Sequence, residues 1–572
     1  MGDSRPRLRA VSFPLVAGLT LLTFVILYLT RSLDDNRLTN WQWCFQGGAA
    51  VRVFFATALG VVISYLFASS PLGGRYRAAV LFVLGFAASS FFWTEPEVIV
   101  DASRYFTQAK HLELYGIRYF AEEWGKEIVA WTDMPLVPFL YGIVFRIFGE
   151  ARTHVQIITS ALFAGAVVLT YLTGRELWDE EVGFYGGMLL LGMPYLLTQT
   201  PLMLVDVPSM FFLVLAVFAF LRALKKGGAA VFLAAGAISL AFFAKYSTWL
   251  MLSVLAAAAA VHIAKDRSGR KKGVMHGDAL RRTAYTVLVA AALIGAGCIY
   301  KFGVISDQIH LLVAYQKPGL GRWSESFLST FLFQIHPFIS ALAVFSVYVA
   351  VRKRDLNYII IIWLVVLVVL MQIKRIRYLI MVFPMFSLAA SYGLRQVQAP
   401  EMRRFIAACA VTSSLAVALF AYLPFLQKLN AVNLRDAGSF LNSVTEPNVE
   451  VFTLLPSEPV VNPAVSVPIL DIFTAKHIRY DYRDLLPPES RKEIENSSLR
   501  FTLDYRNPPY YLAGGHPRVD AVAAVISEDI YDILPDDVRN RLSGYSLLRT
   551  FAVNEGIFRY RTSVRIYRRD SP

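Results

Sequence analysis

The sequence predicts an α-helical membrane protein that crosses the bilayer many times and carries a C-terminal α/β domain outside it. Of the 572 residues, 56% are hydrophobic and only 17% are charged. The mean hydropathy of +0.48 exceeds what a soluble globular chain usually shows. Apolar stretches long enough to cross about 30 Å of hydrocarbon recur along the chain, and we count about thirteen of them. They lie near residues 11–30, 51–69, 78–93, 153–174, 183–200, 208–224, 229–243, 247–264, 284–300, 327–350, 357–373, 378–394 and 405–423.

The charges of the short loops predict the orientation of these spans. Loops rich in Lys and Arg favour the cytoplasmic side, and with the N-terminus inside, alternate loops hold most of the basic clusters. The acidic segment 95–152, the turn at Asp206 and everything beyond Pro424 then lie outside, and only Lys374–Arg377 breaks the pattern. The inside loops contain Arg75 and Arg77, Arg175, Arg222 with Lys225 and Lys226, Lys265–Arg282, Arg352–Arg354, and Arg395 with Arg403 and Arg404.

Three other sequence features narrow the class of protein. The first apolar stretch is expected to be a retained anchor, because it is about twenty residues long and lacks an A-x-A site near its end. None of the three cysteines follows Cys409, so the outside domain has no internal disulfide. The net charge of +14 does not indicate nucleic-acid binding, because much of it lies in inside loops that contact anionic lipid headgroups.

Beyond Pro424 the apolar runs shorten to the length of strands, as at 449–455, 519–526 and 546–553, and alternate with helix-like stretches at 433–443 and 535–542. This alternation predicts the α/β domain. We expect N-terminal transmembrane helices at 1–94, a first outer loop with interfacial helices (102–114 and 136–148) at 95–152, a transmembrane core at 153–424 and the outer domain at 425–572.

Asp101 and Asp206 each stand just outside a long apolar segment, on the same predicted face of the membrane. Two carboxylates at one face suggest chemistry there. A lone Asp is more often a solvated loop acid. For Asp206 a structural interpretation is equally favoured, in which it is the N-cap of a helix with Pro208 in its first turn.

The surroundings of both acids resemble a family. The run Asp101-Ala-Ser-Arg104-Tyr105-Phe-Thr-Gln-Ala109-Lys resembles the D-E-x-R-Y-x-x-x-A-R run that opens the first outer loop of GT-C glycosyltransferases, notably bacterial aminoarabinose transferases and protein mannosyltransferases. Further similar segments follow in the family's order across about residues 95–400. They are Asp133-Met-Pro135-Leu with Phe148-Gly149, Leu204-Val-Asp206-Val-Pro208, Phe243-Ala-Lys245, and Lys374-Arg375-Ile-Arg377-Tyr378 with Phe383-Pro384.

The resemblance implies a GT-C fold, a glycosyltransferase of the family 39 type, a polyprenyl-monophosphate sugar donor and a bacterial inner membrane, with the site facing the periplasm. The sequence also departs from the family. Two of the three spans before Asp101 are extra relative to the arabinose-transferase branch, Ala102 replaces a Glu, and Asp133 stands where that branch has a basic residue. The branch's phosphate contact at that position is therefore not carried over, and the sugar stays open.

The expected chemistry also follows from the residues. A sugar on a polyprenyl phosphate has a good leaving group, so its transfer needs a carboxylate to take the acceptor proton and cations to hold the departing phosphate. This parallels inverting glycoside hydrolysis with an acceptor hydroxyl in place of water. We expect Asp101 to be the base and Asp206 to orient the acceptor or a divalent metal ion. The candidates for binding substrate or lipid phosphate are Arg104, Tyr105, Lys245, Lys374, Arg375, Arg377, Tyr378, His336 and Lys317.

Several of these candidates have structural interpretations as well. Lys245 and the cluster Lys374–Arg377 could simply snorkel to headgroups, and Arg104 could pair with Asp101 one helical turn away. His336 is more often a satisfied core histidine than a ligand. The loop 301–326, with Lys317, Arg322 and Trp323, reads as a mobile lid or an ordinary exposed loop.

Two other classes of function stay open. A transporter or lipid flippase predicts ionisable residues near mid-span and paired broken helices, whereas the notable charges here stand at the outer ends of spans. A catalytically inactive lipid binder or a scaffold is the third option. The sequence shows neither convincing metal-ligand spacing nor a Gly-rich phosphate loop. The acceptor, whether lipid A, another glycolipid, a glycan or a protein, is not indicated.

Overall fold

The computed structural model describes residues 5–69, 74, 76–271, 279–319, 325–456, 461–481, 487–497, 499–505, 507–512, 521–554, 557 and 560–570. The chain forms two compact units. Unit 1 consists of Met1–Trp93, Ile158–Pro201 and Val205–Phe425, and unit 2 consists of Thr94–Ile157, Leu202–Leu204 and Leu426–Pro572. The domain boundaries expected from the sequence stay a prediction.

Unit 1 is helical. Within the described ranges, eight helical segments are long and apolar enough to cross a membrane, so the protein is a multi-pass integral membrane protein. These segments are Ser12–Leu29 in α1, Ala49–Ser69 (α3), Arg152–Leu177 (α7), Asp206–Lys226 (α10), Ser247–Ser268 (α12 and α13), Ala279–Tyr300 (α14), Ile376–Leu394 (α19 to α20) and Pro400–Leu426 (α21 to α22).

The remaining expected spans form shorter helices. The structure therefore confirms a helical protein that crosses the membrane many times, but it does not confirm about thirteen full-length spans. Pro194 begins a new helix and thereby splits the stretch 183–200. The shorter helices are α4 (Arg77–Ser90), α8 (Glu180–Leu190), α9 (Pro194–Gln199), α11 (Ala229–Ala244), α17 (Pro337–Lys353) and α18 (Asn357–Leu370).

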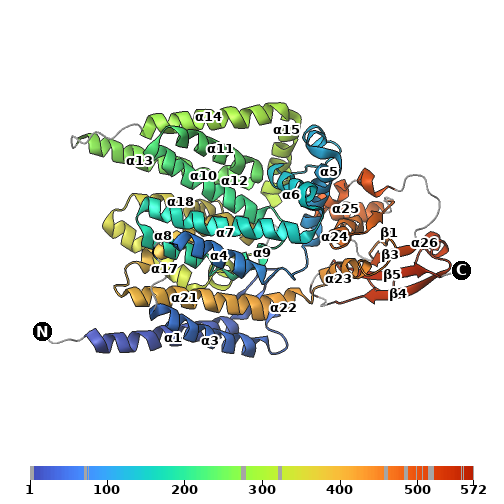
Figure 1. Ribbon diagram of the computed structural model, residues 1–572, viewed down its shortest axis with the longest axis horizontal. Helices are drawn as coiled ribbons and strands as arrows, with labels where there is room; N and C mark the ends of the chain where they lie inside the picture. The colour runs from blue at the N-terminus through green and yellow to red at the C-terminus, as the bar shows by residue number, and fades with distance from the viewer. Residues whose placement is uncertain are drawn as a thin grey trace. The chain divides into compact units, whose positions relative to one another are not determined.

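Helix pairs inside unit 1 pack along much of their length. The helix α10 packs against α11, and α3 packs against α21 (Pro400–Val417) (Figure 1). The helix α17 packs against α20 (Phe383–Leu394). Each of these pairs brings together helices rich in apolar side chains, as a membrane-spanning bundle requires. The pairing of α10 with α11 is the one that positions the site, because the N-terminus of α10 comes to lie beside the C-terminus of α11.

Unit 2 begins with two helices from the segment 95–152. The helix α5 (Ile99–Glu123) is kinked at Gly116, whose φ of 87° and ψ of 176° favour glycine. The helix α6 (Leu136–Phe148) packs against α5 and ends at Gly149, which also has a positive φ.

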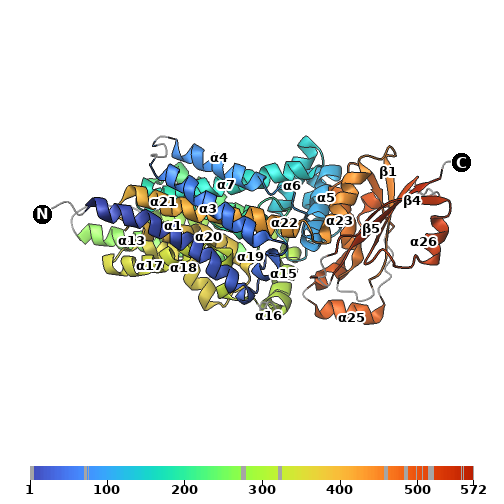
Figure 2. The same ribbon diagram turned by 90° about the horizontal axis from the view of Figure 1, so that it is seen from below.

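The C-terminal part of unit 2 holds a five-stranded mixed sheet in the order β2-β1-β3-β5-β4. The strand β1 runs parallel to β2 and β3, and β5 runs antiparallel to β3 and β4. Figure 2 shows α26 (Asp536–Arg541) beside this sheet, and Val538 of α26 and Leu542 just after it pack on Phe452 of β1 and Val525 of β3. The strands are β1 (Asn448–Thr453), β2 (His477–Arg479), β3 (Val522–Ser527), β4 (Tyr545–Phe551) and β5 (Ser563–Arg569).

This sheet confirms the expected α/β character, and the three expected strands correspond to β1, β3 and β4. The strands β2 and β5 were not expected. The helical segments of this part are α23 (Ala431–Leu441), η7 (Pro463–Ser466), α24 (Val467–Ile472), α25 (Pro488–Asn496), η8 (Arg500–Asp504), η9 (Pro509–Tyr511) and α26 (Asp536–Arg541).

Candidate active site

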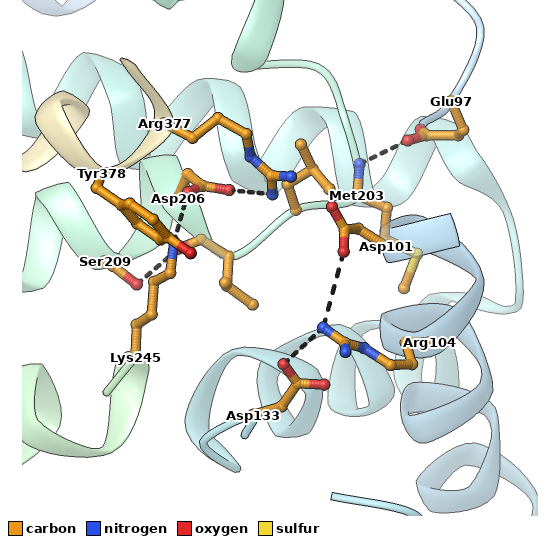
Figure 3. A network of polar contacts seen from close by, with 12 residues as sticks. Glu97, Asp101, Arg104, Asp133, Met203, Asp206, Ser209, Lys245, Arg377 and Tyr378 are labelled. Carbon is orange, nitrogen blue, oxygen red and sulfur yellow. Dashed lines mark hydrogen bonds and ion pairs between the residues drawn. The ribbon is translucent and has the colours of Figure 1, made fainter. Parts of the chain in front are cut away.

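Unit 1 holds a buried carboxylate that contacts two cations (Figure 3). Asp206 is only 1% exposed. Lys245 Nζ lies 2.6 Å from its Oδ1, and Arg377 Nη2 lies 2.8 Å from its Oδ2. Because each carboxylate oxygen accepts from a different cation, the three side chains hold one another in place.

Three helix ends supply these groups. Asp206 is the first residue of α10, Lys245 follows the last residue of α11, and Arg377 lies in the short helix α19 (Ile376–Leu379). An acid at a helix N-terminus is stabilised by the helix dipole. The N-cap of α10 is Val205, so the interpretation of Asp206 as an N-cap is wrong. Its carboxylate contacts the two cations instead.

Aromatic side chains line the cationic side of this cluster. Lys245 Nζ lies 5.2 Å from the centre of the Tyr378 ring, and the Tyr246 hydroxyl donates to the Tyr378 hydroxyl at 3.2 Å. Lys245 is 8% exposed, so simple snorkelling to lipid headgroups does not describe it. Two cations against one carboxylate leave the cluster with an excess of one positive charge.

The neighbouring basic residues differ in exposure. Lys374 is exposed, while Arg375 is half-buried and stacks on Tyr378 at 5.8 Å. Glu325, which is 7% exposed, accepts a hydrogen bond of 2.8 Å from the backbone amide of Ile376 through Oε2. This bond fixes the backbone between Arg375 and Arg377.

In unit 2, Arg104 joins two carboxylates (Figure 3). Its Nη2 lies 2.9 Å from Asp133 Oδ1 and 3.8 Å from Asp101 Oδ1. Burial opposes the charge of Arg104, but Asp133, Tyr105 and Asp101 outweigh it and raise the pKa of the guanidinium. Gln108 Nε2 donates to Asp133 Oδ2 at 3.1 Å and completes this network.

This arrangement gives Asp133 a physical role. The acid that replaces the family's basic residue takes up most of the charge of Arg104, so Arg104 is not a free cation for a phosphate. Asp101 keeps 20% of its side chain exposed in the first turn of α5. A carboxylate with this exposure is accessible to a substrate hydroxyl.

Glu97 is a buried residue that sequence reasoning missed. Its Oε1 accepts from Arg152 Nε at 2.7 Å, and its Oε2 accepts from the backbone amide of Met203 at 2.9 Å (Figure 3). Met203 stands three residues before Asp206, so Glu97 orders the approach to the second acidic turn. The partners are 55 and 106 residues away from Glu97, and no local pattern predicts contacts at that distance.

Two further candidates from the sequence are His336 and Tyr105. His336 is the N-cap of α17, where its Nδ1 accepts from the Phe338 amide at 3.1 Å, so its position is explained by helix capping. Tyr105 is buried beside Arg104, with the guanidinium carbon 5.5 Å from the ring centre.

The expected mobile loop is helical over most of its length, which corrects that prediction for 302–319. It forms α15 (Phe302–Leu311), η2 (Leu312–Gln316) and α16 (Lys317–Gly319). Lys317 is exposed. Arg322 and Trp323 lie outside the described residues.

The donor set around Asp206 does not fit a divalent metal ion, because both carboxylate oxygens already contact cationic groups. Across the described ranges, no group of three or more His, Cys, Asp or Glu side chains has an arrangement that could hold a metal ion.

Comparison with known proteins found a matching family model and similar solved structures. Residues 133–280 match the family described as dolichyl-phosphate-mannose-protein mannosyltransferase. Two crystal structures of ArnT from Cupriavidus metallidurans share the fold at 12% identity. The structure bound to undecaprenyl phosphate covers 86% of this chain and 98% of its own with a TM-score of 0.52, and the apo structure covers 89% and 98% with a TM-score of 0.50. No curated protein sequence matches the chain.

The chain therefore contains a segment that matches a glycosyltransferase family, and it shares the fold of ArnT. The segment that matches the family contains Asp133, Asp206 and Lys245. The resemblance noted from the sequence is therefore confirmed at the level of the family.

Proposed function

We propose that this glycosyltransferase moves a sugar from a polyprenyl-monophosphate carrier to an acceptor hydroxyl at the outer face of the membrane, with inversion at the anomeric carbon. The observation that carries the proposal is the buried cluster of Asp206, Lys245 and Arg377 with its excess positive charge. The ArnT structure that shares this fold was solved with undecaprenyl phosphate bound, which supports the choice of a lipid-linked donor.

In the proposed reaction, the acceptor oxygen attacks the anomeric carbon while its proton passes to the carboxylate of Asp101. The bond between the anomeric carbon and the phosphate oxygen breaks, and the polyprenyl phosphate leaves with the electron pair. One carbon–oxygen bond forms and one breaks. The leaving phosphate needs no protonation, so a single base is sufficient.

We propose that Arg377 and Lys245 stabilise the negative charge that develops on the phosphate. Arg offers a planar fork for phosphate oxygens, and Lys offers a point charge. Because Asp206 fixes both cations before the reaction, little reorganisation is needed as charge develops. Asp206 then acts by orienting these cations. Arg375 and Lys374 add further positive charge beside them in the sequence, and Tyr378 lines the cationic side of the cluster.

We further propose that the outer face is the exterior or periplasmic face of the inner membrane. The distribution of Lys and Arg among the short loops supports this orientation. The acceptor is a lipid, glycan or protein hydroxyl, and the sugar is a hexose or pentose.

The test is transfer of radiolabelled sugar from a panel of polyprenyl-monophosphate sugars by purified full-length protein in lipid nanodiscs. We expect label transfer by the wild type. We expect Arg377→Met to lower it at least tenfold, since loss of one donor that stabilises developing charge costs about 10²–10³ in rate. Lys374→Met, which removes an exposed cation, is the matched control and should lose less. Absence of transfer from every donor would refute the proposed function.

A further inference from the structure

A pocket in unit 2 is lined by one face of α5. The residues Val100, Ser103, Arg104, Thr107, Gln108 and His111 follow one another at helical spacing along this wall. The facing wall consists of the turn 127–131 together with Val465 of η7, Phe501 and Thr502 of η8, and Tyr505. The pocket and its open mouth together contain about 560 Å³ of empty space, which includes open solvent.

The amide of Gln108 leaves a hydrogen-bond acceptor in this pocket. Its Nε2 donates to the carbonyl of Val129 at 2.9 Å and to Asp133 Oδ2 at 3.1 Å. Both partners only accept, so they fix which end of the amide carries the NH₂ group. The residue is 2% exposed, and Oε1 has no hydrogen-bond partner within the described part of the chain.

His111 supplies a second acceptor. Its Nδ1 lies 2.7 Å from the carbonyl oxygen of Thr107, so Nδ1 carries the ring proton. Burial lowers the pKa of the imidazole and keeps it neutral. The lone pair of Nε2 is therefore an acceptor, and this buried atom lacks a hydrogen-bond partner among the residues that the structure describes. A buried polar atom without a partner is destabilising, and a ligand that donates to it would remove that cost.

Arg104 adds a donor without adding much net charge. Its Nε–H has no hydrogen-bond partner in the described ranges, although its Nη2 is engaged by Asp133 and Asp101. Two acceptors in the same pocket repel a phosphate or a carboxylate. The polar groups thus suit a neutral ligand that can both donate and accept hydrogen bonds.

Aromatic rings form the rest of the binding surface. Phe501 lies under the guanidinium of Arg104, with a distance of 4.3 Å from its ring centre to the guanidinium carbon. Trp131 packs 5.9 Å from Phe501, and its φ of 48° is rare for a residue other than glycine. Backbone strain of this kind tends to occur at functional sites.

We propose that this pocket binds a neutral sugar ring, whose hydroxyls donate to Gln108 Oε1 and His111 Nε2 while its carbon–hydrogen face packs on Phe501 and Trp131. A sugar ring combines groups that both donate and accept with an apolar face. An anionic headgroup matches neither of the two acceptors. The role of the ring, as part of the donor or of the acceptor, rests on the proposed function.

The test is saturation-transfer NMR on the full-length protein in nanodiscs. The probes are the methyl glycosides of glucose, galactose, mannose and N-acetylglucosamine at millimolar concentration. We expect saturation of ring protons by the wild type for at least one glycoside, and a loss of at least threefold in His111→Phe, which keeps the ring but removes the acceptor. Thr107→Leu, which fills the pocket from the same wall, should reduce the signal similarly. Glu122→Gln, on the exposed face of α5, is the control and should leave it unchanged.

Absence of signal from all four glycosides, equal signals in the wild type and in both pocket variants, or displacement of the glycoside by inorganic phosphate would overturn the proposal. So would His111-dependent signals from a Ser- and Thr-rich peptide without any from the glycosides. Binding is read without turnover, so a failure of sugar transfer alone would refute the proposed function and leave this inference standing. In transfer assays, inhibition by the glycoside that excess lipid donor relieves assigns the pocket to the donor's ring, and inhibition that it does not relieve assigns it to the acceptor's.

Discussion

Replacing Asp206 with Asn should destabilise unit 1 strongly. The substitution leaves the buried cations Lys245 and Arg377, whose side chains are 10% and 12% exposed, without a compensating charge. Removing one partner of a buried ion pair typically costs about 3–5 kcal/mol. At roughly 2–4 °C per kcal/mol for a domain of 150–250 residues, and less for a larger one, we expect the melting temperature to fall by about 5–10 °C.

A double-mutant cycle separates this mechanism from a general loss of packing. Lys245→Met alone leaves Asp206 paired with Arg377, so its cost should be smaller. In the double variant the orphaned ammonium is gone, so the double variant should be more stable than the sum of the two single effects predicts. We expect a coupling of about 1–3 kcal/mol between Asp206 and Lys245.

The assay is thermal unfolding of the purified full-length protein in detergent, followed by tryptophan fluorescence at one pH and one ionic strength. Lys374→Met changes an exposed cation and should shift stability by about 0.5 kcal/mol or less. Additive effects of the two substitutions, or an Asp206→Asn protein as stable as the wild type, would refute the reasoning.

Three further substitutions test other parts of the structure. Glu97→Gln, which weakens the hold on the amide of Met203, should lower the rate of sugar transfer about tenfold or more with donor binding kept; unchanged transfer would count against this positioning role. Burial raises the pKa of Asp34 from 3.8 to about 6. The folded state therefore binds the proton of the Asp34 carboxyl more tightly than the unfolded chain does. The stability that this protonated carboxyl contributes falls by roughly 3 kcal/mol as the pH rises from about 4 to above 6. The melting temperature of Asp34→Asn should therefore depend less on pH across that window than that of the wild type, and equal slopes would contradict the shift. Gly116→Ala should destabilise α5 by about 1–3 kcal/mol, because its φ of 87° favours glycine, and unaltered melting would contradict the kink.

Local patterns predicted the local elements well. The amphipathic helix expected at 136–148 is α6 (Leu136–Phe148), and the strand expected at 449–455 is β1 (Asn448–Thr453). Both follow from hydrophobic periodicity over a single element. The interruption before α9 was missed, although Pro194 marks it, because the apolar composition continues unbroken across the turn.

The site was predicted residue by residue but not as an assembly. Asp206, Lys245 and Arg377 were each identified, yet their pairing joins positions 39 and 171 residues apart. The sequence suggested Asp101 as the partner of Arg104. Its closer contact is Asp133, 29 residues away, and not Asp101 on the same helix. Side-chain pairing at such separations depends on tertiary packing, which a single sequence does not reveal.

The most direct test of the central claim is a single-turnover measurement with purified wild-type protein and Asp101→Asn, each saturated with a radiolabelled polyprenyl-monophosphate sugar that the wild type uses. The account predicts that both proteins bind the donor with similar affinity. It also predicts that transfer to the acceptor is slower by about 10²–10⁴ in the variant, the range that a positioned general base contributes. Equal rates of transfer would contradict the assignment of Asp101 as the base.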